Sequence, residues 1–484
     1  MYSARTAYRY MSNPRANLYV KVFIAAALLR IVAALAYHQP NQSVDSWGYD
    51  LMARNLLSSG MISAKIEPPH VPSGYREPGY PAFLAGCYWV IGVHPMGAVV
   101  IQSTLGAVGT VLFVMLVVRL TGMTSRWLVW AAMLVALATP WISSTGWAEL
   151  MREDLLHSLL LGTILLADWL ARRKRASWAQ AAALGAMVGV GMLIKATFAV
   201  LLPVIVIVWL AVMRHRAILP VAVAAVMAGA VIAPWLARNY ALFGQPALAC
   251  TKGLILYQHS GQPDRTDGVE PKYRQLAHAL AGQWPDVGRY SPPAGYSLDT
   301  HDGWTHFCHV FWQIIVDRDG LKPEEADAVL YRIAAQDARR DPGRYLAITA
   351  SNISFYLTGG LAGGKPRPQE VVSKRPVFRR AFHALRPAAI IVLEALAVVE
   401  MTMFRRSLLA WMVILTAGGT ILANSVVSAG HWRYRATVDV LLAVLAVAVL
   451  ARFVGFRRSV PPPVCPDADH GTGATSTRLP CQGN

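Results

Sequence analysis

Residues 97–119 read GAVVIQSTLGAVGTVLFVMLVVR and contain no charged side chain before Arg119. A helix of this length covers the roughly 30 Å hydrocarbon layer of a bilayer. Similar apolar runs recur along the 484 residues, which are 55% hydrophobic and 15% charged. Ordinary soluble domains have about 25% charged residues, so this composition excludes a typical soluble enzyme. The sequence therefore predicts an all-α polytopic membrane protein.

Basic residues orient the predicted spans. The first span, 19–37, has four basic residues before it or at its start, which the positive-inside bias keeps in the cytoplasm: Arg5, Arg9, Arg15 and Lys21. The next short cytoplasmic connections are also basic, around Arg119, at 172–175 and around Arg214. The other predicted spans, which make about ten in all, are 97–119, 127–145, 153–171, 177–193, 196–213, 217–237, 386–402, 407–427 and 436–454.

The same pattern divides the chain into regions. In order, we expect a cytoplasmic tail (1–18), a transmembrane core (19–237) with a first external loop (38–96), a large external region (238–385), C-terminal spans (386–454) and a disordered cytoplasmic tail (455–484). In the external region, 322–341 is predicted to be a surface helix, because Pro323 suits a first turn and acids follow it. Residues 345–363 are interpreted as interfacial rather than spanning.

Charge and cysteine content narrow the function classes. The net charge of +18 is assigned to cytoplasmic loops and lipid headgroups rather than to nucleic acid. The five cysteines form no CxxC pair, so no structural zinc site is spelled out. Cys250 and Cys308 fall in the external region, where a disulfide or two free thiols are both open. The nearby histidines, His301, His306 and His309, match no standard zinc spacing.

Two motifs follow the first span. Asp45 begins the run Asp45-Ser46-Trp47-Gly48-Tyr49, and a carboxylate at the membrane boundary is a candidate general base. The alternative is a helix N-cap. The second motif is Tyr75-Arg76-Glu77-Pro78-Gly79-Tyr80-Pro81, in which Arg76 is a candidate for binding an anionic group or, alternatively, lipid headgroups.

Three later segments carry further candidates. Glu153 opens the fourth span, and an acid at that boundary is either functional or placed for the helix dipole. The segment Pro234-Trp235-Leu236-Ala237-Arg238-Asn239-Tyr240 ends the seventh span, and His431-Trp432-Arg433-Tyr434-Arg435 precedes the last one. Arg30 lies in the middle of the first span, where we expect a structural ion pair with a residue such as Glu394 or Asp439.

These five motifs, in this order and at these membrane positions, resemble those of the C-type membrane glycosyltransferases (GT-C). The similar branch contains bacterial relatives of dolichyl-phosphate-mannose protein mannosyltransferases and the lipid A aminoarabinose transferase. The resemblance covers about residues 30–455 and implies a GT-C transmembrane helix bundle with short helices in its external loops. The chain departs from many members at Ser46, where they have Glu, and at Lys195, where they have Arg.

The resemblance implies transfer of a sugar, with inversion, from a polyprenyl phosphate to a cell-envelope hydroxyl at the external face of a bacterial inner membrane. Asp45 would be the base and Glu153 a second catalytic acid. Five cations are predicted near the external boundary and would bind the donor phosphate, snorkelling being the alternative: Arg76, Lys195, Arg238, Arg433 and Arg435. The candidates for lining the sugar pocket are Tyr49, Tyr80 and Tyr434.

No cofactor or metal ligand is assigned from the sequence. Some related enzymes use a divalent ion, and this alternative stays open at Asp45 although the adjacent second acid is missing. Two other functions are kept as alternatives. A flippase or transporter of a lipid-linked saccharide would line a path through the bilayer with cations, whereas an O-antigen-type polymerase would lack the two motifs around Asp45 and Arg76. Neither the sugar nor the type of acceptor is predicted.

Overall fold

The computed structural model describes residues 14–37, 43–142, 149–174, 176–288, 291, 298, 301–358, 395–396, 399, 407–427 and 432–454. All regular secondary structure in these residues is helical, which confirms the prediction of an all-α protein. The helices of the first half are α2 (Pro14–Tyr37), α3 (Val44–Ser59), α4 (Gly79–Ile91), α5 (Pro95–Thr121), α6 (Arg126–Ile142), α7 (Glu153–Arg173), α8 (Trp178–Ile194), η1 (Ala196–Val200), α9 (Leu201–Met213), η2 (Arg214–Ala217) and α10 (Ile218–Phe243). Those of the second half are α11 (Lys252–Ser260), α12 (Pro271–Gln283), α13 (His301–Asp319), α14 (Pro323–Arg340), α15 (Pro342–Thr358), α18 (Leu408–Val427) and α19 (Trp432–Phe453).

Helices coincide with the predicted spans wherever these fall in the described residues. Among the described residues, six helical stretches are long and apolar enough to cross a membrane, and α6 and α8 contain shorter apolar helices. The span predicted at 386–402 lies outside the described residues except for 395, 396 and 399. The chain is thus a multi-pass membrane protein by the length and composition of its helices.

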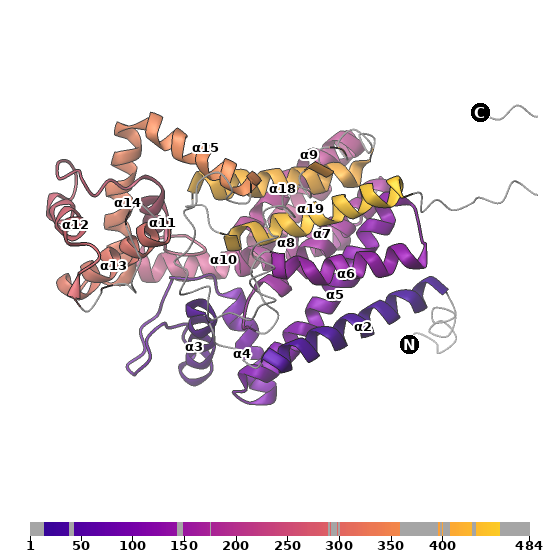
Figure 1. Ribbon diagram of the computed structural model, residues 1–484, viewed down its shortest axis with the longest axis horizontal. Coiled ribbons are helices and arrows are strands. Elements are labelled where there is room, and N and C mark those ends of the chain that lie inside the picture. The colour runs from indigo at the N-terminus through magenta and orange to yellow at the C-terminus, as the bar shows by residue number, and fades with distance from the viewer. Residues whose placement is uncertain are drawn as a thin grey trace, which may run out of the picture.

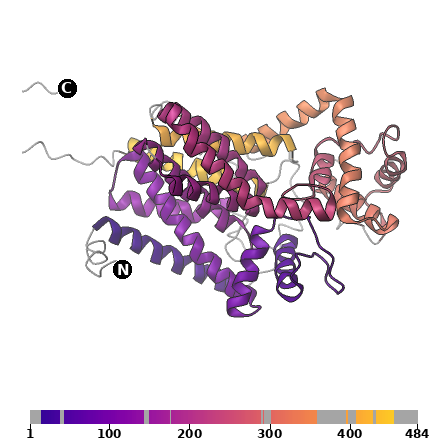
Figure 2. The ribbon, with the colours of Figure 1, turned by 180° about the vertical axis from the view of Figure 1, so that it is seen from behind.

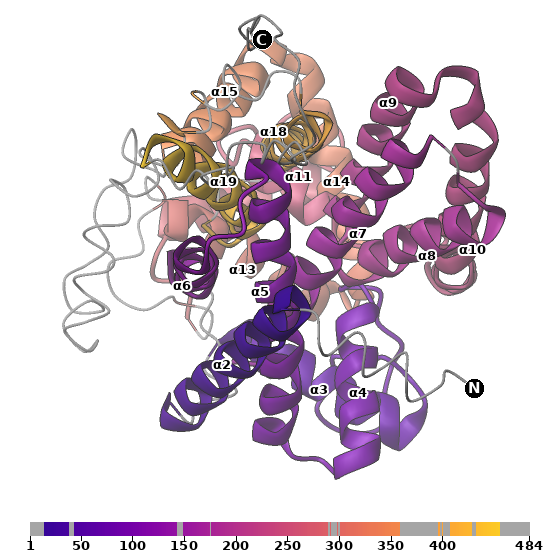
Figure 3. The same ribbon diagram turned by 90° about the vertical axis from the view of Figure 1, so that its right-hand side faces the viewer.

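The longest apolar stretch, Ala196–Phe243, folds back on itself rather than running straight. The chain reverses at η2, where Arg214 has a φ of 55°. Figure 3 shows α9 and α10 beside each other, so the two spans predicted at 196–213 and 217–237 both exist as separate helical segments. Helix α10 then continues to Phe243 and ends at Gly244, whose left-handed conformation lets its N–H bond to the Tyr240 carbonyl. The Arg238-Asn239-Tyr240 motif therefore lies on this helix and not beyond it.

The membrane bundle packs around α5, α7 and α19. Helix α2 packs on α5, α8 packs on α10, and α6 and α18 both pack on α19. The α8–α10 contact depends on small residues, since a Cβ at Gly185 would lie 2.1 Å from the Ala224 carbonyl oxygen. One polar link in the apolar core is the indole N–H of buried Trp209, which donates to the Ala167 carbonyl oxygen at 3.1 Å.

The two segments that were predicted to be external lie towards the same end of the molecule. Helices α11–α15 form a lobe at the end opposite to the one at which α2 begins and α19 ends, and α3 and α4 lie beside the bundle on the lobe's side (Figures 1 and 2). The helix predicted at 322–341 is present as α14, with Pro323 in its first turn, but one face of it is buried in the lobe rather than lying on the surface. Buried aromatic rings hold this lobe together, among them Tyr257, Phe307 and Phe311.

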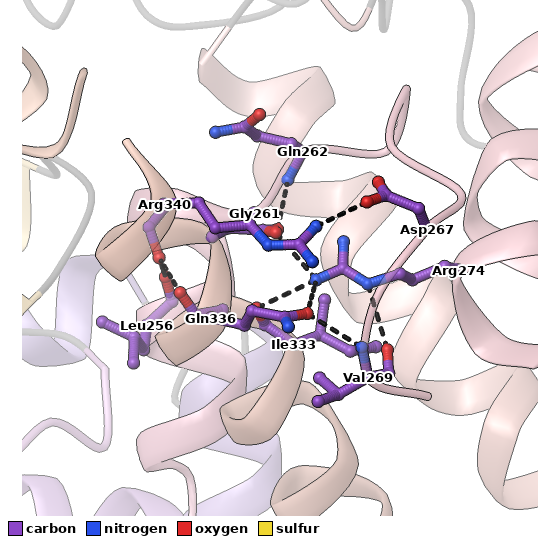
Figure 4. Close-up of polar contacts among 12 residues, drawn as sticks. Leu256, Gly261, Gln262, Asp267, Val269, Arg274, Ile333, Gln336 and Arg340 are labelled. Carbon is purple, nitrogen blue, oxygen red and sulfur yellow. Dashed lines mark hydrogen bonds and ion pairs between the residues drawn. The ribbon is translucent and has the colours of Figure 1, made fainter. Parts of the chain in front are cut away.

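A buried arginine ties three parts of the lobe together. The Arg274 side chain is 1% exposed and donates to the Val269 carbonyl oxygen at 3.0 Å and to Gln336 Oε1 at 3.0 Å, as Figure 4 shows. It also pairs with Asp337 at 2.8 Å. Because Val269 precedes α12 whereas Gln336 and Asp337 lie on α14, this cluster fixes the lobe's outer loop on its central helix.

Arg30 pairs with Asp154, an acid that was not named as its expected partner, whereas Glu394 lies outside the described residues. Its side chain is 2% exposed and reaches from α2 past α5 to the first turn of α7. Helix α5 leaves room for it at Gly106, where a Cβ would lie 2.3 Å from Arg30 Nη2. The ion pair thus joins α2 to α7 within the apolar core.

Replacing Arg30 alone should destabilise the protein more than removing both charges. Arg30→Met leaves Asp154 buried without its cation, and we expect a loss of roughly 3–5 kcal/mol in the free energy of unfolding. The double variant Arg30→Met/Asp154→Leu should recover most of that loss. SDS-induced unfolding in mixed micelles measures both, and a single variant as stable as wild type would contradict the structural role of the pair.

Candidate active site

Asp45 lies in the first turn of α3 but does not cap it. The N-cap is Ser43, whose hydroxyl accepts from the Ser46 N–H at 3.2 Å while the Ser46 hydroxyl accepts from the Ser43 N–H at 3.0 Å. This capping box satisfies the helix start without Asp45, so the alternative interpretation of Asp45 as a cap is wrong. Its carboxylate is left to interact outside its own helix.

The carboxylate of Asp45 forms an ion pair with Arg76, 31 residues further along the chain. The side chains are 26% and 17% exposed, so the pair is partly buried and still reachable. The Arg76 guanidinium lies over the Tyr49 ring at 4.7 Å from its centroid. The structure thus brings together Asp45, Arg76 and Tyr49, all three of which the sequence singled out.

A second ion pair lies one residue further on. Glu77 Oε2 accepts from Arg152 Nη1 at 2.8 Å, and Glu77 Oε1 accepts from the Ala196 N–H at 3.0 Å. Arg152 Nη1 also donates to the Ile194 carbonyl oxygen at 3.2 Å. Both neighbours of Lys195 in the chain are therefore held by this pair, and Lys195, which is 3% exposed, is fixed between α8 and η1.

Glu77 lies in the segment between α3 and α4, and its carboxyl is ionised. Burial alone would raise the pKa of its carboxyl, but the Arg152 guanidinium and the N–H of Ala196 hold that pKa below the ordinary value of 4.5. Glu77 is thus a carboxylate at neutral pH, and its pair with Arg152 is fully charged.

Two buried tyrosines lie beneath these charges. Tyr49 and Tyr80 are each 1% exposed and meet edge to face, with their ring centroids 4.9 Å apart. The Tyr80 hydroxyl donates to Gln102, whereas the buried Tyr49 hydroxyl has no hydrogen-bond partner within the described residues. Burial raises the pKa of Tyr49 although Arg152 and Arg76 act against it, so this group stays a neutral phenol. A neutral hydroxyl can donate to or accept from a sugar hydroxyl.

Glu153 is buried at the start of α7, directly after Arg152, and is 4% exposed. It is close enough to Tyr49 and Lys195 to act on both electrostatically. It therefore belongs to the same group of charges as the two ion pairs. The next acid, Asp154, faces the other way, towards Arg30.

The remaining predicted cations are less closely connected to this group. Arg238 donates to the Ser73 carbonyl oxygen at 3.3 Å and to Asn239 Oδ1 at 2.7 Å, so it lies beside the segment that carries Arg76. Arg433, Tyr434 and Arg435 lie in the first turn of α19, but their side chains fall outside the described residues, and their roles stay predictions.

The sequence left open a metal ion at Asp45 and a disulfide between Cys250 and Cys308. No group of three or more His, Cys, Asp or Glu side chains there is arranged to hold a metal ion. Cys250 and Cys308 are both buried and free, so the free-thiol alternative applies. His309 instead forms a 3.3 Å hydrogen bond with Gln258.

Sequence reasoning missed the partners that organise the site. Glu77 was part of a quoted motif and Arg152 adjoins Glu153, but nothing in their spacing indicated that they pair across 75 residues. Gln102, the acceptor of the Tyr80 hydroxyl, was also missed. A polar residue inside a predicted span was the signal available for it, because such a group needs a buried partner.

Comparison with known proteins finds similar structures but no similar sequence: no family model and no curated protein matches the chain. One similar structure is ArnT from Cupriavidus metallidurans bound to undecaprenyl phosphate, at 16% identity over 90% of this chain and 78% of that chain, with a TM-score of 0.37. Another is the Archaeoglobus fulgidus oligosaccharyltransferase tethered with an acceptor peptide, at 14% identity over 92% of this chain and 50% of that chain, with a TM-score of 0.45.

Both are membrane glycosyltransferases of the GT-C class that the sequence resemblance indicated. Identities of 16% and 14% with TM-scores of 0.37 and 0.45 carry no information on substrate, reaction or residue roles.

The Glu77–Arg152 pair predicts a pH-dependent stability difference. Glu77→Gln leaves Arg152 without its anion and should cost roughly 1.5–3 kcal/mol at neutral pH. Because the folded-state pKa of Glu77 is lowered, this contribution is present above 4.5, the ordinary value, and is lost as the pH falls through the lowered one. Thermal unfolding of both proteins across pH measures the difference. The exposed Glu67→Gln is the matched control, and a difference that does not change with pH would contradict the assignment.

Proposed function

We propose that the protein is an inverting glycosyltransferase that moves a sugar from a polyprenyl-phosphate donor to an acceptor hydroxyl at the external face of a bacterial inner membrane. The observation that carries this proposal is the Asp45–Arg76 ion pair. In this pair a carboxylate that could act as the base lies next to a cation that could bind the phosphate, in the segment between two apolar helices. A lipid-linked phosphate would lie at that depth, since its chain stays in the bilayer and its headgroup stays at the interface.

The chemistry needs both members of the pair. The acceptor oxygen forms a bond to the anomeric carbon while the bond from that carbon to the phosphate oxygen breaks. The acceptor proton goes to Asp45, and the bonding electrons leave with the polyprenyl phosphate. The leaving group needs no proton if cations meet its charge, which is the role assigned to Arg76 with Lys195.

The ion pair also suggests the order of events. Without donor, the Arg76 guanidinium satisfies the Asp45 carboxylate. A bound phosphate competes for the same guanidinium, and its capture frees an Asp45 oxygen to accept the proton of the acceptor hydroxyl. The base is thus exposed only when the leaving group is already paired, which limits unproductive encounters with water.

The surrounding residues take supporting roles in this proposal. Tyr49 and Tyr80 line the sugar pocket, and Glu153 balances the positive charge around Lys195. Arg238, with Arg433, Tyr434 and Arg435, completes the donor site. The external lobe faces the acceptor, as loops over a rigid scaffold commonly do.

A metal ion does not fit the residues next to Asp45. Asp50 is the next acid on α3, and it accepts from the Tyr88 hydroxyl at 2.5 Å and pairs with Arg54 at 2.9 Å. No step of the proposed reaction is therefore assigned to a metal. Arg30, the cation within the first span, is paired with Asp154, so it does not support a charged path for transport.

Asp45→Asn should abolish transfer, because the amide cannot take the acceptor proton. Donor binding should be at least as tight as in wild type, because Arg76 no longer has to leave a carboxylate to bind the phosphate. The assay offers purified protein in nanodiscs a panel of radiolabelled polyprenyl-phosphate sugars, with and without a cell-envelope extract, and scores the released polyprenyl phosphate. Asp50→Asn, a change of the same kind on the same helix, should retain transfer. Wild-type activity in Asp45→Asn would remove Asp45 as the base.

Arg76→Ala should weaken binding of undecaprenyl phosphate by roughly 10- to 100-fold, since a charge-assisted contact is worth about 1.5–3 kcal/mol. Arg54→Ala is the control, because Arg54 is half exposed and pairs with Asp50 on its own helix. Fluorescence or calorimetric titration in nanodiscs measures both. Equal affinity of Arg76→Ala and wild type would refute the phosphate role.

A further inference from the structure

Residues 74–77 contact three separate parts of the protein within four consecutive positions. Gly74 and Tyr75 contact the external lobe, Arg76 contacts α3, and Glu77 contacts the starts of α7 and η1. This segment, here called the junction, is therefore the physical connection between the lobe and the proposed donor site.

The link to the lobe runs through the backbone of Gly74. Its N–H donates to Glu324 Oε1 at 3.0 Å, and its carbonyl oxygen accepts from the Cys250 N–H at 2.7 Å. Glu324 is 5% exposed and lies in the first turn of α14, 250 residues away in the chain. A carboxylate accepts a stronger hydrogen bond from a backbone N–H than a neutral oxygen does, so this contact holds Gly74 firmly.

Close packing supports the same conclusion. A Cβ at Gly74 would lie 2.8 Å from Cys250 Sγ and 2.9 Å from Phe243 Cε2. The neighbouring Tyr75 ring packs against Trp312 at a centroid distance of 5.7 Å, and the Trp312 indole donates to the Pro323 carbonyl oxygen at 3.1 Å. The lobe side of the junction is thus held by both α13 and the start of α14.

The donor side starts at the next residue. Arg76 follows Tyr75 directly, so a displacement of Gly74 shifts the origin of the Arg76 side chain relative to Asp45. Glu77 limits this freedom from the other side, through Arg152 and the N–H of Ala196. Only two peptide bonds separate Gly74 from Arg76, which leaves little slack to absorb a movement of α14.

We propose that Glu324 is a positioning residue that sets the place of Arg76 through Gly74, so that the external lobe controls the donor-phosphate site. This inference rests on the proposed function of Arg76. Glu324 itself does not touch donor or acceptor. Its carboxylate holds the backbone from which Arg76 reaches either Asp45 or the phosphate, and an acceptor that moves α14 thereby changes donor affinity.

The test measures undecaprenyl phosphate binding to the full chain in nanodiscs. Glu324→Ala should weaken binding by roughly 5- to 10-fold, as expected for the loss of one charge-assisted hydrogen bond. Glu324→Gln keeps an oxygen that accepts from the Gly74 N–H and should stay within about twofold of wild type. The double variant Glu324→Ala/Arg76→Ala should bind no more weakly than Arg76→Ala alone, because both changes act through one contact.

Two further variants separate positioning from general damage to the lobe. Glu325→Ala removes the side chain that accepts from the Lys322 N–H at 2.8 Å, which weakens the same end of α14 without touching Gly74, and should bind as wild type does. Gly74→Ala keeps Glu324 but displaces the junction and should lose affinity like Glu324→Ala.

Wild-type affinity in both Glu324→Ala and Gly74→Ala, or additive losses in the double variant, would overturn the inference while Arg76→Ala still supports the donor site. If Arg76→Ala also binds as wild type does, the proposed phosphate site fails and this inference fails with it.

Discussion

A charge or an unpaired backbone group in the hydrocarbon layer costs much free energy, and this cost determines both the secondary structure and the positions of the charged residues. It makes the membrane part helical, because helices satisfy their own backbone. It also places chemistry at the ends of the helices, where Asp45, Lys195 and Glu153 lie at the starts or ends of α3, α8 and α7. The cation in the first span, Arg30, is tolerated because Asp154 neutralises it. The end of the bundle next to the lobe therefore collects these charged groups.

Ion pairs between distant parts of the sequence then assemble that end. Asp45–Arg76 joins α3 to the loop before α4, and Glu77–Arg152 joins this loop to α7. Each of these pairs is partly shielded from water, which strengthens the attraction without removing access. Adjacent residues of one loop thus make different contacts: Arg76 pairs with Asp45 on α3, whereas Glu77 fixes the backbone around Lys195.

The sequence was sufficient for the features that depend on local composition. Apolar length predicted the helices, and Pro323 with its following acids predicted α14. The sequence was insufficient where the rotation of a helix about its own axis decides which side chains meet. Arg30 was expected to meet Glu394 or Asp439 because hydropathy gives the depth of a residue but not the face on which it lies, and the structure turns it to Asp154. For the same reason the Glu77–Arg152 pair could not be predicted. Asp45 and Arg76 were both named as candidates, but their contact with each other was not predicted.

The Arg76 side chain is long, so the backbone of the junction can stay rigid while the guanidinium exchanges Asp45 for a phosphate in the proposed reaction. The backbone of Gly74 is fixed by Glu324 and Cys250, and that of Glu77 is held through Arg152 and Ala196. The guanidinium of Arg76 is several rotatable bonds away from this fixed origin. In the proposed reaction it would leave Asp45 for a phosphate by changing rotamers alone, with no backbone to reorder. Less entropy is then lost when the donor binds, whereas a mobile loop would have to be ordered at that moment.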